Sequence, residues 1–183
     1  MAPTLNRSLA DLGALLHLVD PTLPIGGFNH SNGLETFVQQ GVVSTKPSLE
    51  EYVQTQLLQN WVYNDGAYLS LAFEAMATND FDRLCELDHS LSATKIARES
   101  REGSFKLGVR LLKIFIRYEQ HPMLSQFQQA IQNKTVQGYF PIVFAMVAHA
   151  MGLSKADTLY AFYYNAAVGT ITNGVKLIPL SQM

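Results

Sequence analysis

The segment LPIGGFNHSNGLET, from Leu23 to Thr36, separates two stretches of helical pattern. Before it, apolar residues recur every three or four positions, as on one face of an α-helix, and Pro21 and Pro24 end that helix. Gly26 and Gly27 supply backbone angles that other residues resist. A loop that needs this shape is typical of a specific contact, and no catalytic constellation accompanies it in the sequence.

The residues after this loop predict a second helix. It begins near Ser31 or Asn32, with Glu35 placed three residues after Asn32 as a capping-box partner. Gly41 can take the left-handed conformation that ends it. The glycine-rich segment is therefore expected to connect two helices.

Helical periodicity continues through nearly the whole chain, and no convincing strand alternation interrupts it. Further boundaries are expected at a capping box of Ser48 with Glu51, a long helix over Ala97–Tyr118 ended by His121-Pro122, a helix that begins at Pro141, and a last helix capped by Ser154 and Asp157. The sequence predicts one all-α domain over residues 1–183, a single-domain bundle of about eight helices.

The composition points to contact with other proteins. Charged residues make up 15% of the chain, against roughly a quarter in ordinary soluble proteins, and apolar residues make up 48%. So little charge predicts exposed apolar patches, which commonly mark partner surfaces. The alternative is a well-covered monomer whose surface is wetted by neutral Gln, Asn, Ser and Thr. With a net charge of −2 and no basic stripe, the chain is not expected to bind nucleic acid.

Targeting features are absent from the sequence. Cys85 is the single cysteine, so an internal disulfide is excluded and a reducing compartment is favoured. The N-terminus lacks the apolar core of a signal peptide, and no run approaches the roughly 20 apolar residues of a membrane span. We expect a cytoplasmic protein that does not enter a membrane.

Catalytic and metal-binding patterns are also missing. The five histidines show no spacing of a local metal site, and His30 is of interest only because it lies in the glycine-rich loop. Cys85 sits in a helical pattern and is interpreted as filler rather than a nucleophile. Gly26-Gly27 is followed by Phe28-Asn29, not by the Gly-Lys-Ser/Thr of a phosphate-binding loop. We expect no catalytic residues and no cofactor of the chain's own, and the residues of any metal site stay unknown.

Two charged features allow both a structural and a functional interpretation. The stretch from Arg98 to Glu102 is either a solvated helix face with local ion pairs or a surface that reaches a partner. Lys176 either caps the C-terminus of the last helix or presents a cation within an apolar contact surface.

Taken together, these residues resemble a known family. LHLVDPTLPIGGFNHSNGLETFVQQGVV (Leu16 to Val43) resembles the N-terminal signature of the UreF family of urease accessory proteins, and TNGVKLIPLSQ (Thr172 to Gln182) resembles its C-terminal signature. SREGSF (Ser100 to Phe105) and GYFPIVFAMVAHAMGL (Gly138 to Leu153) match between them, in order and spacing. The resemblance covers essentially the whole chain.

The resemblance implies an all-α fold and a non-enzymatic task in nickel-enzyme maturation. Family members bind a second accessory scaffold protein and recruit the nickel-carrying GTPase, so that nickel, handled by the wider complex, reaches apo-urease. They commonly form homodimers. The sequence departs from the family at Tyr139, where a histidine is common, and at Ser181, where a glycine is usual; it also lacks the usual C-terminal extension beyond that motif.

The resemblance also implies a partner-binding surface. In the family, the acidic residue that matches Glu35 and the cation that matches Lys176 are associated with the surface that faces the GTPase. The expected partner-contact residues are Pro24, Gly26, Gly27, His30, Ser31, Glu35, Arg101, Glu102 and Lys176.

Two other function classes remain as alternatives. The first is a GTPase-activating protein that supplies an arginine in trans, with Arg98, Arg101 and Arg110 as candidates. The second is an all-α small-molecule enzyme with a site among Cys85 and buried Tyr and Glu residues.

Overall fold

A computed structural model of the chain describes residues 8–27 and 33–178. These residues form nine α-helices and one π-helix, and they contain no strand. The helices are α1 (Leu9–Leu18), α2 (Leu34–Gln39), α3 (Lys46–Thr55), the π-helix η2 (Gln56–Trp61), α4 (Asp65–Ala77), α5 (Phe81–Thr94), α6 (Arg98–Phe115), α7 (Pro122–Gln132), α8 (Phe140–Ala150) and α9 (Lys155–Leu177). The prediction of an all-α bundle is confirmed.

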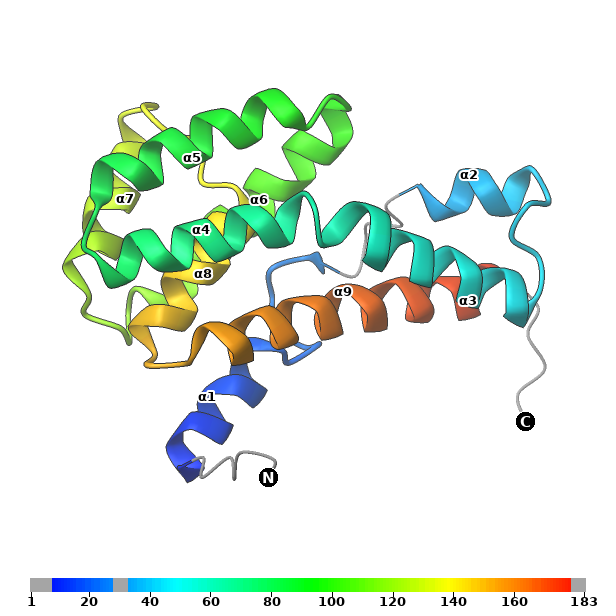
Figure 1. Cartoon of the computed structure of the whole chain (residues 1–183), viewed down its shortest axis with the longest axis horizontal. Coiled ribbons are helices and arrows are strands. Elements are labelled where there is room, and N and C mark those ends of the chain that lie inside the picture. The colour runs from blue at the N-terminus through cyan, green and yellow to red at the C-terminus, as the bar shows by residue number, and fades with distance from the viewer. Residues whose placement is uncertain (1–7, 28–32, 179–183) are drawn as a thin grey trace.

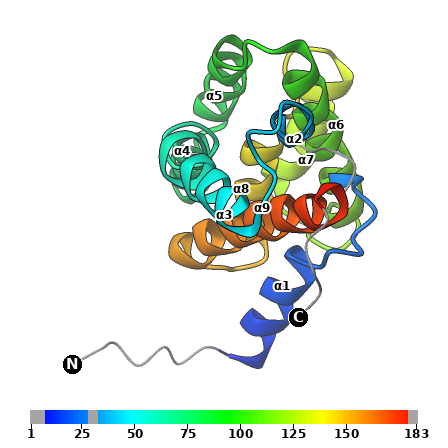
Figure 2. The same ribbon diagram turned by 90° about the vertical axis from the view of Figure 1, so that its right-hand side faces the viewer.

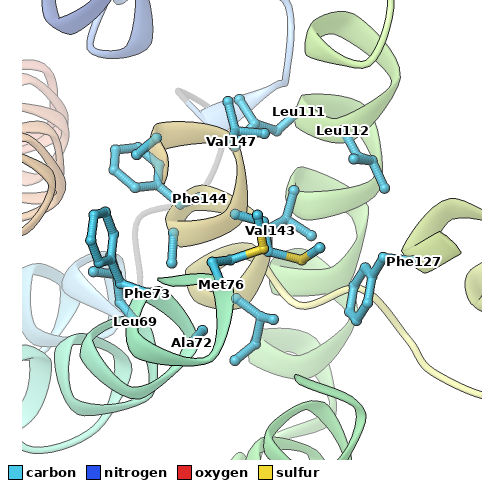
Figure 3. Close-up of a cluster of buried hydrophobic side chains, with 14 of the residues drawn as sticks. Leu69, Ala72, Phe73, Met76, Leu111, Leu112, Phe127, Val143, Phe144 and Val147 are labelled. Atoms are coloured by element: carbon cyan, nitrogen blue, oxygen red, sulfur yellow. The ribbon is translucent and has the colours of Figure 1, made fainter. Parts of the chain in front are cut away.

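Helix α8 is the centre of the bundle. Its sequence, FPIVFAMVAHA, is apolar on every side, and residues 141–148 are all buried. A helix with no polar face is stable only when neighbours cover it all round. α8 packs most extensively against α4 and α6, which flank it (Figure 1). Figure 3 shows how side chains from these helices and from α7 meet around it, among them Phe73, Leu111, Phe127 and Val143.

A glycine allows α6 to approach the start of α8. A Cβ atom on Gly108 would lie 2.1 Å from the carbonyl oxygen of Gly138 and 2.9 Å from the backbone nitrogen of Phe140. Real side-chain carbons do not approach backbone this closely, so a larger residue would push the two segments apart. The close approach seats α6 against the segment that leads into α8.

A second hydrophobic cluster lies apart from this core. It joins α2, α3 and the C-terminal end of α9, and we call this region the α2–α3 lobe; its buried members are Leu34, Val43, Leu49, Tyr52 and Ile178. In Figure 1 the lobe occupies the side opposite α7, and α9 runs from the main core into it. Figure 2, turned by 90°, shows α1 extending from the body below α9. No helix among residues 8–27 and 33–178 is both long and apolar enough to cross a membrane.

Two local expectations are corrected, and a third falls outside the described residues. The capping box at the start of α3 pairs Thr45 with Ser48, not Ser48 with Glu51, because the helix begins before Pro47 and places that proline in its first turn. α2 begins at Leu34 after Gly33, and the expected start at residues 31–32 lies outside the described residues. No separate helix was expected between residues 122 and 140, yet α7 occupies Pro122–Gln132.

The position of Pro122 explains why the sequence does not predict α7. A proline stops a helix that it follows, but it is also well tolerated as the first residue of the next one, where its missing N–H would lack a partner anyway. Here it is that first residue, and His121 accepts a hydrogen bond from Met123 N as the N-cap. Other boundaries are confirmed: Ser154 caps α9 through Asp157 N, and α6 falls within the expected 97–118.

Candidate partner-binding surface

The segment that follows α1 is folded by its own side chains. Asp20 Oδ1 accepts hydrogen bonds from Thr22 Oγ1 and Thr22 N, both at 2.7 Å. The bond from the hydroxyl is the largest cause that lowers the pKa of Asp20, and the bond from the backbone N–H is the second. Leu23 and Ile25 are buried, whereas Pro24 between them is exposed. The loop therefore presents Pro24 to solvent while its two neighbours anchor it in the protein.

Gly26 lies close to the guanidinium of Arg110 on α6. Its φ is +85°, a left-handed angle that residues with a side chain rarely adopt. Arg110 Nη1 donates a hydrogen bond to Ile25 O at 3.0 Å, and a Cβ atom on Gly26 would lie 2.4 Å from the same nitrogen. Glycine is therefore required here for two reasons, the backbone angle and the space that the guanidinium occupies. The exposed Gly27 follows it.

A cavity of about 250 Å³ lies beside this loop, between α6, α9 and the start of α4. Its apolar walls include Trp61, Phe140 and Phe162, and its polar lining includes the ion pair of Lys95 with Asp65. Lys95 Nζ lies 2.7 Å from Asp65 Oδ1, and both side chains are largely shielded from solvent. Leu23, Ile25 and Gly27 line the cavity on the side of the loop.

Glu35 and Lys176 belong to the same lobe although 141 positions separate them in the sequence. Glu35 is exposed in the first turn of α2, and Lys176 is exposed in the last turn of α9. Their near neighbours Leu34 and Ile178 are both buried in the cluster of the α2–α3 lobe. The fold thus joins the N-terminal and C-terminal motifs through a shared core. His30 and Ser31 lie outside the described residues.

Arg101 has a structural task. Its Nη1 donates hydrogen bonds to Lys95 O and Ile96 O, each at 2.8 Å. These carbonyls follow the last turn of α5, where backbone oxygens lack helical partners. Arg101 therefore ties the α5–α6 connection to α6, and through Lys95 it also supports the wall of the cavity.

Glu102 forms the solvated ion pairs that a helix surface commonly carries. It accepts from Arg98 Nε at 2.7 Å and from Lys106 Nζ at 3.5 Å. The hydrogen bond from Arg98 is the main cause that lowers the pKa of Glu102. Because Arg98 is 83% exposed, its pair contributes little to stability.

The described residues show no metal cluster and no activated nucleophile. No three His, Cys, Asp or Glu side chains among them lie close enough together to hold a metal ion. Burial, and then the charges of Asp88 and Asp82, raise the pKa of the Cys85 thiol, which keeps it in the unreactive protonated form. Tyr139 is 2% exposed and donates a hydrogen bond to Ser92 Oγ at 3.0 Å.

Exposed apolar side chains gather on α9. Tyr160, Tyr164, Ile171 and Val175 repeat at helical spacing and are between 45% and 65% exposed. The rings of Tyr160 and Tyr164 stack with centroids 6.2 Å apart. The apolar patches predicted from the low charge content are therefore present. Arg110, by contrast, was identified from the sequence only as one of several arginines, because its contact spans 85 residues and no local pattern records it.

Comparisons with known proteins agree on one family. The family model described as UreF matches residues 43–183. The chain is 85% identical over its 183 residues to the urease accessory protein UreF of Haemophilus influenzae (strain KW20 / Rd), of which it covers 78%. It is 80% identical over 175 residues to the protein of that name from Actinobacillus pleuropneumoniae serotype 5b, with 96% of this chain and 77% of the relative covered. It is 35% identical over 168 residues to the one from Lachnoclostridium phytofermentans, with 92% and 74% covered.

Proposed function

The chain belongs to the UreF family of urease accessory proteins, and on this premise we propose that it acts as a non-catalytic adaptor in urease maturation. It binds a second accessory scaffold protein, recruits the nickel-carrying GTPase, and couples GTP hydrolysis to the delivery of nickel into apo-urease. The protein works in the cytoplasm as a homodimer. Nickel is cargo of the whole complex.

The observation that carries this proposal is the joining of the two family motifs in the α2–α3 lobe. Glu35 and Lys176 are exposed, and Leu34 and Ile178 share one buried cluster. An acidic and a basic group on one lobe can recognise a partner of complementary charge pattern and set its orientation. The exposed apolar stripe of α9, from Tyr160 to Val175, supports a further contact of larger apolar area.

The arginine-finger alternative finds less support. Arg101 and Arg110 donate hydrogen bonds to backbone carbonyls of this chain, and Arg98 pairs with Glu102. A finger arginine must leave such partners before it can reach a phosphate. Arg98, exposed and weakly paired, would give up least, and Arg98→Ala is the variant that tests the alternative.

Co-purification of the chain with its proposed partners tests the adaptor function. We expect the tagged chain to retain the scaffold protein and the GTPase together. We expect Glu35→Lys and Lys176→Glu each to lose the GTPase while keeping the scaffold. Asp82→Lys on α5 and Lys113→Glu on α6 reverse a charge at exposed positions outside the lobe and serve as matched controls. Retention of the GTPase by both lobe variants would contradict the assigned surface, and failure of the unaltered chain to retain either protein would contradict the function.

A further inference from the structure

Two buried side chains, Leu23 and Ile25, anchor residues 23–27 in the main core. Leu23, Ile25 and Gly27 also line the cavity, so this segment borders an open space on one side. Its own hydrogen bonds are local, such as Leu23 N to Asp20 O at 3.1 Å and Ile25 N to Leu23 O at 2.7 Å. Local bonds shape a loop but do not fix its position relative to the body.

One polar contact holds the backbone of this segment to another element. Among the described residues, the bond from Arg110 Nη1 to Ile25 O is the one side-chain hydrogen bond that links residues 20–27 to another helix. Arg110 projects from α6, an 18-residue helix packed against α8, so its backbone is a rigid reference. A charged donor on a carbonyl makes a stronger bond than a neutral one.

Gly26 leaves the space that the guanidinium of Arg110 occupies. The site at which Gly26 would carry a side chain is the site of the guanidinium, 2.4 Å from Nη1. The φ of Gly26 is +85°, an angle that a residue with a side chain adopts only under strain. The two residues therefore form one unit: the glycine makes room, and the arginine occupies the room and holds the loop.

From this geometry we propose that Arg110 is a positioning residue, which fixes the Pro24–Gly27 loop against α6 in the orientation that the partner binds. The inference rests on the proposed function in taking this loop as part of the partner surface. Arg110 acts through the loop backbone and needs no contact with the partner itself. Lysine at this position can still donate to Ile25 O, whereas alanine cannot.

The test compares Arg110→Ala, Arg110→Lys and, as a control on the same helix, Lys113→Ala, which removes an exposed cation elsewhere on α6. Hydrogen–deuterium exchange is measured in the full chain, on a peptide that covers Leu23 to Gly27. Its rate reports how firmly the backbone of the loop is held. Titration with the scaffold protein and the GTPase reports partner affinity. For Arg110→Ala we expect faster exchange in this peptide and about tenfold weaker binding, because the freed loop must be ordered when the partner binds. The melting temperature should fall by only a few degrees, since the lost bond also contributes to folding.

Arg110→Lys should recover most of the affinity, and Lys113→Ala should match the unaltered chain. Gly26→Ala adds a second readout, because its methyl group meets the guanidinium. It should weaken binding more in the unaltered chain than in the Arg110→Ala background, where only the strain of the left-handed angle remains.

Two results would overturn the proposal: unchanged exchange in Arg110→Ala, or faster exchange with full partner affinity. An unaltered chain that binds neither partner would contradict the proposed function and, with it, the partner half of the inference. The exchange rates would in that case still decide whether Arg110 holds the loop.

Discussion

The carboxylate of Asp88 holds the backbone of Gly138 from across the bundle. Asp88 Oδ2 accepts hydrogen bonds from Gly138 N and Tyr139 N, each at 3.0 Å, and Oδ1 accepts one from Gln137 N at 2.6 Å. Asp88 lies on α5 and is fully buried. Burial raises its pKa, and the three N–H donors oppose that rise. One side chain thus fixes the segment that leads into the central helix α8.

Replacement of Asp88 by asparagine should destabilise the protein. The amide NH2 group cannot accept a hydrogen bond, so at least one of the three backbone N–H groups would lose its partner. We expect a loss of about 2 kcal/mol in the free energy of unfolding at pH 7, measured by urea denaturation. Asp82→Asn, at an exposed position of the same helix, is the control and should change stability little. Equal stability of the two variants would show that the three bonds do not fix this segment.

Gly108→Ala tests the close approach of α6 to the start of α8. Its methyl group would meet the backbone of Gly138 and Phe140, which cannot move aside as a flexible side chain could. We expect a loss of about 3 kcal/mol, at the upper end of the cost of overpacking. Gly13→Ala in α1, where the added carbon meets nothing within 4 Å, should instead leave stability equal or slightly higher. A thermal melt in which both variants behave alike would refute the packing described.

The α2–α3 lobe should loosen when its own core is reduced. Leu34 is fully buried in the cluster that joins α2 to α9, and Leu34→Ala should cost about 3 kcal/mol. We expect hydrogen exchange to accelerate in α2 and α3 more than in α8, because α8 belongs to the separate main core. Leu58→Ala, at a position 57% exposed, is the control. Uniform acceleration throughout the chain would mean that the lobe is not a separate unit.

Acid should destabilise the protein through His149. Burial, and then the nearby His121, lower the pKa of His149, and its ring packs against Phe73. A histidine with a lowered folded pKa binds fewer protons when folded than when unfolded. Stability is therefore full above the unfolded value of about 6.5 and falls as the pH drops from there towards the folded pKa.

Urea denaturation at pH 7.5, 6.5 and 5.5 measures this dependence. We expect a smaller acid loss in His149→Gln than in the unaltered chain, whereas His89→Gln, on the exposed face of α5, keeps the full loss because it retains His149. If His149→Gln loses as much stability as the unaltered chain over this range, another group is responsible.

Local signals in the sequence were sufficient for most of the fold. Ser154 and Asp80 cap their helices through the next turn, and such short-range bonds can be recognised from a few residues. Pro122 misled the prediction because the same residue ends one helix and begins another.

The candidate site and the segment that leads into α8 depend on contacts that local patterns do not contain. The bonds from Asp88 to residues 137–139 and from Arg110 to Ile25 join residues some 50 and 85 positions apart. Nothing near Asp88 in the sequence distinguishes it from an exposed helix residue, and Arg110 looks like a surface cation. The family resemblance identified Glu35 and Lys176, but it could not show that one buried cluster unites their surroundings.

Urease activity in cells that lack their own member of this family, grown at limiting nickel, tests the central claim most directly. We predict that the chain restores activity, and that the double variant Glu35→Lys/Lys176→Glu, expressed at the same level, does not. The Haemophilus influenzae relative, 85% identical, is the positive control. The claim would be contradicted if that relative restores urease activity while this chain, expressed at the same level, leaves urease without nickel and inactive.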